Sequence, residues 1–197
     1  MNRSRVAGTV LAVAVGALGA PGTAHAQFVG LSFRGAHVYA GGVFPTASHR
    51  GASFGAVLWI DTLLDRRLPW GPAIHYSSAD RTDAPVTVRD IALAIDAAYP
   101  LGSMGRIVPY LGASASLHSA DARVSDAVRD PGELATAEGV AADVDGYKLG
   151  GAGFAGLVWR LTETGAVGLL AEYRFTVAPD LTRQEARVGI RFSVGGP

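Results

Sequence analysis

One pair of residues in this sequence has the right chemistry for nucleophilic catalysis. His75 and Ser77 are two positions apart, so on an extended strand their side chains lie on the same face. A histidine beside a serine acts as a general base that activates the hydroxyl when an acid orients the imidazole ring. Glu172 or Asp90 could supply that acid. An interior histidine with a serine at the rim explains the same pair without any catalysis.

A second group of polar residues is typical of a buried charge network. Its members are isolated acids and arginines on strand faces that otherwise carry glycine, alanine and serine. They are Asp90, Asp96, Glu172, Arg174, Glu185, Arg187 and Arg191. Charges that leave water need partners of opposite sign. We therefore expect these side chains to pair with one another inside the protein.

Two further patterns resemble ligand sites. Asp143 and Asp145 match the start of a calcium loop, but no glutamate follows at the spacing that an EF-hand requires. They predict at most a weak contact with a divalent cation. The string Gly151–Gly156 matches the dinucleotide fingerprint, without the βαβ unit that this function requires. Glycines on a barrel strand explain it better, and no cofactor is expected.

The elements that would position these residues are β-strands. Apolar residues alternate with small or charged residues in about eight segments, which is the period of a strand with two different faces. The expected strands are 31–44, 53–61, 69–78, 88–99, 107–117, 147–159, 167–175 and 187–194. The links between them are too short for parallel crossovers. The fold class is therefore all-β, a single antiparallel up-and-down barrel.

The N-terminus is typical of a secretory signal peptide. Two arginines precede the apolar run Val6–Leu18, and Ala24-His25-Ala26 forms a small-residue cleavage site. We expect residues 1–26 to be removed and 27–197 to form the barrel domain. Without the two arginines, 15 basic residues face 17 acidic ones, a net charge of about −2. A nucleic-acid partner is therefore not expected.

The composition of the two strand faces indicates which one meets lipid. Small residues on the polar face suit the narrow interior of an eight-stranded barrel. Lys148 is the only lysine, whereas a soluble exported domain carries several on its surface. Trp70, Tyr99, Tyr173 and Phe192 lie near strand ends on the apolar face, where aromatic residues meet the membrane interfaces. We predict a transmembrane β-barrel with its apolar face outward.

The lengths of the links predict the orientation of this barrel. With an N-terminus on the inner side, the short links 63–68, 100–106 and 161–165 are periplasmic turns. The link Ser119–Gly146 is long and acidic and falls on the outside. Outer-membrane barrels have short periplasmic turns and longer extracellular loops. We expect residues 119–146 to be a solvated extracellular loop that meets an outside partner.

Several short motifs resemble those of small outer-membrane β-barrel proteins similar to the OmpA transmembrane domain and OmpX. They are Tyr99-Pro100-Leu101-Gly102, Val108-Pro109-Tyr110-Leu111-Gly112-Ala113, Ala171-Glu172-Tyr173-Arg174-Phe175 and Val188-Gly189-Ile190-Arg191-Phe192. The resemblance implies an integral outer-membrane protein with a structural or surface-interaction role and no open, porin-like channel. It implies outer-membrane lipid, lipopolysaccharide and the β-barrel assembly machinery as partners. Such barrels usually end on an aromatic residue, whereas here Phe192 is followed by five more residues.

Two other functions follow from the same residues read differently. Outer-membrane lipid A deacylases of the PagL type cleave an ester with a histidine and a serine on a strand, and His75 and Ser77 would take those roles. A soluble periplasmic barrel would instead turn the apolar face inward and bind a lipid or another ligand there.

Overall fold

The computed structural model describes residues 31–44, 49–62, 68–81, 84–126 and 128–194. Within these residues, eight strands form one closed barrel in chain order, and one helix interrupts the series. The strands are β1 Leu31–Phe44, β2 His49–Thr62, β3 Trp70–Arg81, β4 Val86–Pro100, β5 Ile107–Val124, β6 Gly146–Arg160, β7 Val167–Val177 and β8 Arg183–Ser193. The helix, α2, runs over Pro131–Val144. The predicted signal peptide, residues 1–26, lies outside the described residues.

Every strand pairs antiparallel with its neighbours in the chain, and β8 pairs back to β1. The register between β1 and β8 runs from Gly35 opposite Ser193 to Phe44 opposite Gln184. The sheet therefore has no unpaired edge in the described residues. The predicted all-β antiparallel barrel is confirmed. Each predicted strand overlaps an observed one, but β2 and β8 begin four residues earlier than predicted and β5 ends seven residues later.

The side chains alternate between the inside and the outside of the barrel, as the period-two pattern predicts. On β4, Asp90, Asp96 and Ala94 are buried, whereas Leu93 and Ile95 are 59% and 56% exposed. The same alternation holds along β7, where Leu170, Glu172, Arg174 and Thr176 are buried and the residues between them are exposed. Alternation follows because successive side chains of a strand point to opposite faces.

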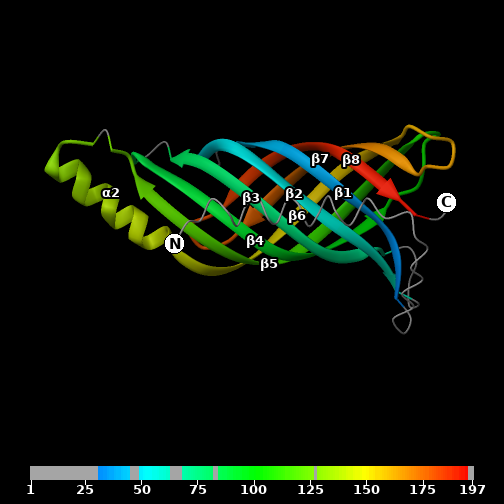
Figure 1. Ribbon diagram of the computed structural model, residues 1–197, viewed down its shortest axis with the longest axis horizontal. Helices are drawn as coiled ribbons and strands as arrows, with labels where there is room; N and C mark the ends of the chain where they lie inside the picture. Colours follow the sequence, from blue (N-terminus) through cyan, green and yellow to red (C-terminus); the bar gives the residue numbers. More distant parts are fainter. Residues whose placement is uncertain (1–30, 45–48, 63–67, 82–83, 127, 195–197) are drawn as a thin grey trace.

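The two ends of the barrel differ. The short links β4–β5 and β6–β7 lie at the end where the chain terminates, and α2 projects beyond the opposite end (Figure 1). Gly102, Gly105 and Gly165 have positive φ angles in these short links, where glycine is the residue that turns without strain. We refer to the end with the short links as the turn end and to the other as the helix end.

The expectation that residues 119–146 form one long loop is wrong. β5 continues to Val124, and α2 fills most of what remains. Asp130 caps α2 by accepting hydrogen bonds from the backbone N–H groups of Gly132 and Glu133, at 2.8 and 3.1 Å. The strand is longer than predicted because β4 extends beside it as far as Val86.

One face of α2 covers the helix end of the barrel. Ala137 and Val144 are fully buried. They belong to a cluster with apolar residues from the strand ends and links around them. That cluster, the helix-end apolar cluster, consists of Ala84, Val86, Val88, Ala120, Ala137, Val144, Ala178 and Leu181. None of the helices in the described residues is long and apolar enough to cross a membrane.

Candidate functional site

The interior of the barrel holds a continuous series of ion pairs. Its members come from β4, β7 and β8, and all of them are buried. In order of contact they are Asp96, Arg174, Glu172, Arg187, Glu185, Arg183 and Asp90. Each guanidinium in this ion-pair chain bridges two carboxylates. Four acids and three arginines thus pair with one another, as buried charges require, although Oδ1 of Asp90 is buried without a hydrogen-bond partner in the structure.

Arg174 makes the contacts at the turn-end side of the ion-pair chain. Its Nη2 atom lies 2.5 Å from Oδ2 of Asp96 and its Nη1 atom 3.3 Å from Oδ1, which is a bidentate pair. Its Nε–H donates to Glu172 at 3.1 Å. The guanidinium also lies over the ring of Phe154, 4.3 Å from the centroid.

Arg187 and Arg183 continue the chain along β8. Arg187 pairs with Glu185 through two nitrogens and lies 3.4 Å from Glu172. Arg183 donates to Glu185 at 2.6 Å and to Asp90 at 2.8 Å. Three charged side chains two residues apart on one strand thus alternate in sign and neutralise their neighbours.

The structure brings six of the seven predicted network residues into the ion-pair chain. Arg191, the seventh, is half-buried on the same face of β8, nearer the turn end. Arg183 was missed: the last strand was expected to begin at 187, and of the charged residues just before it only Glu185 was included. The alternation of Arg183, Glu185 and Arg187 was the signal that could have extended it.

The predicted His75 and Ser77 pair points into the barrel, and both residues are buried. The His75 ring is hydrogen-bonded through Nδ1 to the hydroxyl of Tyr39. Its Nε2 atom lies 3.4 Å from Nη1 of Arg174 and 3.6 Å from Asp96. Among the described residues, no hydrogen bond joins His75 to Ser77. His75 is therefore placed as a member of the polar interior and does not face this serine as a base.

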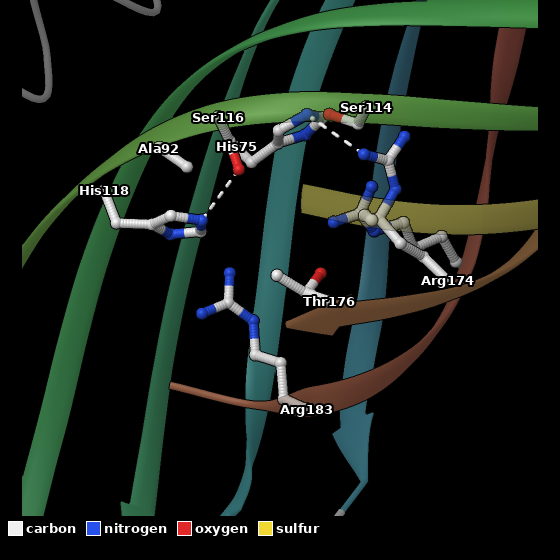
Figure 2. A pocket seen from close by; sticks show the side chains of 10 residues that line it. His75, Ala92, Ser114, Ser116, His118, Arg174, Thr176 and Arg183 are labelled. Atoms are coloured by element: carbon white, nitrogen blue, oxygen red, sulfur yellow. Dashed lines mark hydrogen bonds between the residues drawn. The ribbon is translucent and has the colours of Figure 1, made fainter. Parts of the chain in front are cut away.

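A different serine and histidine do meet, as Figure 2 shows. Oγ of Ser116 lies 2.9 Å from Nε2 of His118, and Nδ1 of His118 lies 2.8 Å from Oδ2 of Asp90. These are the contacts of a serine that is activated by a base and an acid. Sequence reasoning missed them because Asp90 and His118 lie on different strands. Only the register of β4 against β5, with Ala92 opposite His118, brings them together.

The size of the cavity beside Ser116, His118 and Asp90, the interior triad, limits the molecules that can reach it. The cavity there has a volume of about 10 Å³ and is lined by Ser114, Ser116, His118, Thr176 and three arginines, among others (Figure 2). That is room for one water molecule. An ester with an acyl chain does not fit. The arrangement can hold a water and polarise a hydroxyl, but it has no place for a substrate.

The weak metal candidates lie at the helix end. The Asp145 carboxylate accepts a hydrogen bond from the backbone N–H of Ala122 at 3.1 Å, and the backbone carbonyl of Asp143 accepts one from Lys148 at 2.8 Å. Within the described residues, no group of three or more potential ligands gathers around a common point. The string Gly151–Gly156 lies on the strand β6, whereas the dinucleotide fingerprint requires a turn followed by a helix.

Comparison with known proteins identifies the fold. No protein-family model matches this chain, and no curated protein matches it. Among solved structures, Neisserial surface protein A is 18% identical, with a TM-score of 0.56 over 84% of this chain and 99% of the other. The N-terminal β-barrel domain of Pseudomonas aeruginosa OprF is also 18% identical, with a TM-score of 0.46 over 81% and 97%. OprG of the same organism is 10% identical, with a TM-score of 0.46 over 82% and 97%.

The match to Neisserial surface protein A carries the assignment, and it agrees with the closed strand order derived above. The chain has the fold of the small eight-stranded β-barrels of bacterial outer membranes.

Proposed function

We propose that this protein is an integral outer-membrane β-barrel with a structural or surface-interaction role, without an open pore. The observation that carries the proposal is the apolar outer surface of the barrel. Large apolar side chains project outward from strands on all sides and stay exposed. They include Phe44, Leu58, Leu93, Leu111, Leu157, Leu169 and Val188. Complete burial of such a side chain is worth about 1.5–3 kcal/mol. In water these half-exposed side chains forgo part of that gain, whereas lipid provides the missing burial.

The apolar surface has the limits of a membrane-spanning belt. On β4, the outward positions from Ile91 to Tyr99 carry no charged side chain, and the next outward residue towards the helix end is Arg89. On β5 the outward positions from Ile107 to Leu117 are also uncharged. Spans of about ten residues match the thickness of a bilayer crossed by tilted strands.

Aromatic residues mark the turn-end limit of this belt. Tyr99 and Trp159 face outward close to the short links, and they are 43% and 54% exposed. Such rings suit the boundary between hydrocarbon and headgroups. The rings mark one boundary of the membrane. The short links at the same end support the orientation in which the turn end is periplasmic and α2 is extracellular. Hydrocarbon offers no hydrogen-bond partners, so strands in a membrane must pair with one another. The closed barrel meets this requirement because, in the described residues, its sheet has no free edge.

Side chains fill the barrel at the level of the ion-pair chain, which supports a role other than conduction. The ion-pair chain crosses the lumen, and the helix-end apolar cluster packs at the helix end of the barrel. A side-chain-filled eight-stranded barrel has no aqueous channel. Outer-membrane lipid, lipopolysaccharide and the assembly machinery are the partners that this proposal implies. The outward apolar face also opposes the alternative of a soluble carrier, which requires the reverse arrangement.

Gel mobility of the membrane fraction, with and without boiling in detergent, tests the proposal. We expect a band that migrates differently before and after heating, because a closed barrel resists detergent until it is heated. The protein should stay with the membranes after a urea wash, and the purified barrel should give no stable conductance in planar bilayers. A soluble protein without a heat shift would refute the membrane assignment.

A further inference from the structure

The small cavity beside the interior triad, which we call the triad cavity, has the size of a site for one small molecule. Its volume of about 10 Å³ is close to the minimum that a single water molecule needs. Several of the side chains around it are seen together in Figure 2. Among those that line it are Ala92, Ser114, Ser116, His118, Ala152 and Thr176.

The strand register explains why a space remains at this position. Ser114, Ala152, Thr176 and Arg183 are successive partners across β5, β6, β7 and β8. Ala152 has the shortest side chain of this row. Ala92 is equally short, and it lies opposite His118 where β4 pairs with β5. Two alanines among longer polar side chains thus leave a gap whose remaining lining is polar.

One of the lining hydroxyls has no partner within the protein. Oγ of Ser114 is buried and makes no hydrogen bond in the structure. Buried polar atoms in folded proteins are normally paired, either with other protein groups or with an ordered water. Ser116 already contacts His118, but a hydroxyl has one donor and two acceptor sites, so it keeps further capacity. A molecule in the triad cavity therefore meets at least two hydroxyls.

The arginines that line the triad cavity already have counter-charges. Arg174, Arg183 and Arg187 each pair with two carboxylates of the ion-pair chain. Their charge therefore requires no bound anion. Arg183 uses Nε and Nη1 for its carboxylates, and a guanidinium has five N–H donors, so a donor remains for a neutral acceptor. The lining suits a neutral molecule that both donates and accepts hydrogen bonds.

From the size of the triad cavity and its lining, we infer that it binds one water molecule, which pairs with Ser114 and joins the interior triad to the ion-pair chain. The water accepts a hydrogen bond from a guanidinium N–H and donates to hydroxyl oxygens. It gives Ser114 the partner that the protein does not supply. It also links β5 to the arginines of β7 and β8, which are not neighbours of β5 in the sheet. The inference concerns the interior alone and does not depend on where the barrel resides.

Transfer of NMR magnetisation from water to methyl groups tests the inference directly. The sample is the folded chain in deuterated nanodiscs, with the chain itself deuterated except at its alanine methyls. We expect transfer from water to the methyls of Ala92 and Ala152, which line the triad cavity. The methyls of Ala73 and Ala120 are the control, because they are buried elsewhere and should receive none. Ala152→Val fills the space and should abolish the transfer to Ala92.

Two serine substitutions measure what the water contributes to stability. Ser114→Ala removes the hydroxyl with which the water pairs. We expect it to raise the equilibrium constant for unfolding by urea in phospholipid vesicles about fivefold, as the loss of one hydrogen bond implies. Ser53→Ala is the matched control, since Oγ of Ser53 is also buried without a partner but does not line the triad cavity. That substitution should leave the constant unchanged or lower it. The heat-shifted gel band shows that each variant folds.

The absence of transfer to both Ala92 and Ala152 would mean a dry cavity and would overturn the inference. Equal effects of Ser114→Ala and Ser53→Ala on unfolding would overturn it as well. So would transfer to Ala92 that survives in folded Ala152→Val, because the signal would then come from the hydroxyl of Ser116. Transfer that disappears when chloride is raised at fixed ionic strength would assign the cavity to an anion instead. If Ala152→Val fails to fold, the comparison of the two serine variants decides.

Discussion

Replacing Arg174 with methionine tests whether the interior charges are held by mutual pairing. Arg174 bridges Asp96 and Glu172 and is itself buried. Methionine keeps the apolar stem that packs near Phe154 but removes the charge. Breaking one partner of a buried ion pair costs about 3–5 kcal/mol, because the remaining carboxylate stays buried without compensation.

Most of this loss should come from Asp96. Glu172 keeps the Tyr110 hydroxyl at 3.1 Å and Arg187 at 3.4 Å. After the substitution, the contact that the structure still gives to the Asp96 carboxylate is His75, at 3.6 Å. We therefore expect the double variant Arg174→Met/Asp96→Leu to recover about half of the loss or more, because an apolar pair often replaces a buried ion pair at little cost.

The assay is equilibrium unfolding by urea in phospholipid vesicles, followed by tryptophan fluorescence, for both single variants and the double variant. The control is Arg123→Gln. Its pair with Asp121 is exposed, 55% and 37% for the two side chains, so its loss should cost at most about 1 kcal/mol. Two results would contradict this reasoning and indicate a hydrated interior. One is that Arg174→Met lowers the free energy of unfolding no more than Arg123→Gln does. The other is that the double variant loses the sum of what Arg174→Met and Asp96→Leu lose separately.

Three further substitutions test other parts of the structure. Gly112→Val should destabilise the barrel by about 1–3 kcal/mol in the same urea assay, since a new Cβ would overlap the ring of Phe154, whereas Gly153→Val, with nothing within 4 Å of its Cβ, should cost little. Leu93→Arg, at the middle of the outward belt, should destabilise the barrel in vesicles by about 2–4 kcal/mol, and an equal stability of the two chains would contradict a lipid-facing position. Asp130→Ala should weaken α2 by about 1 kcal/mol, seen as faster amide hydrogen exchange in 131–144; unchanged exchange would show that packing alone holds the helix.

The barrel could be predicted from the sequence because its two faces differ so sharply. Outward positions such as Ile91, Leu93 and Ile95 are large and apolar, while the residues between them are small or charged. Period-two alternation is a local property of the sequence and depends on no distant contact. It therefore predicts the strands and their two faces without knowledge of which strands pair.

The helix was missed although its signals are present. Asp130-Pro131 followed by Glu133 is a typical helix start. Ala137, Val140, Ala141 and Val144 then recur at helical spacing and form the face that packs on the barrel. The acidic composition of the segment instead predicts a solvated loop. The triad of Ser116, His118 and Asp90 could not be found in this way, because it depends on the register between two strands.

The abundant glycines explain how the ion-pair chain is held in position. Three inward aromatic rings each lie across a glycine on the neighbouring strand. The pairs are Tyr39 with Gly55, Tyr110 with Gly156 and Phe154 with Gly112. At each of these glycines a Cβ would collide with the facing ring, so any other residue would displace it.

These rings in turn support the charges. The guanidinium of Arg187 lies over Tyr39 and that of Arg174 over Phe154, each 4.3 Å from the ring centroid. Stacking fixes the plane of each guanidinium, so that its nitrogens meet two carboxylates at once. Gly55 and Gly112 thus make room for the two rings that orient the arginines, and the arginines pair with the acids that the narrow barrel encloses. In the string 151–156, Gly156 makes room for Tyr110, whose hydroxyl donates to Glu172.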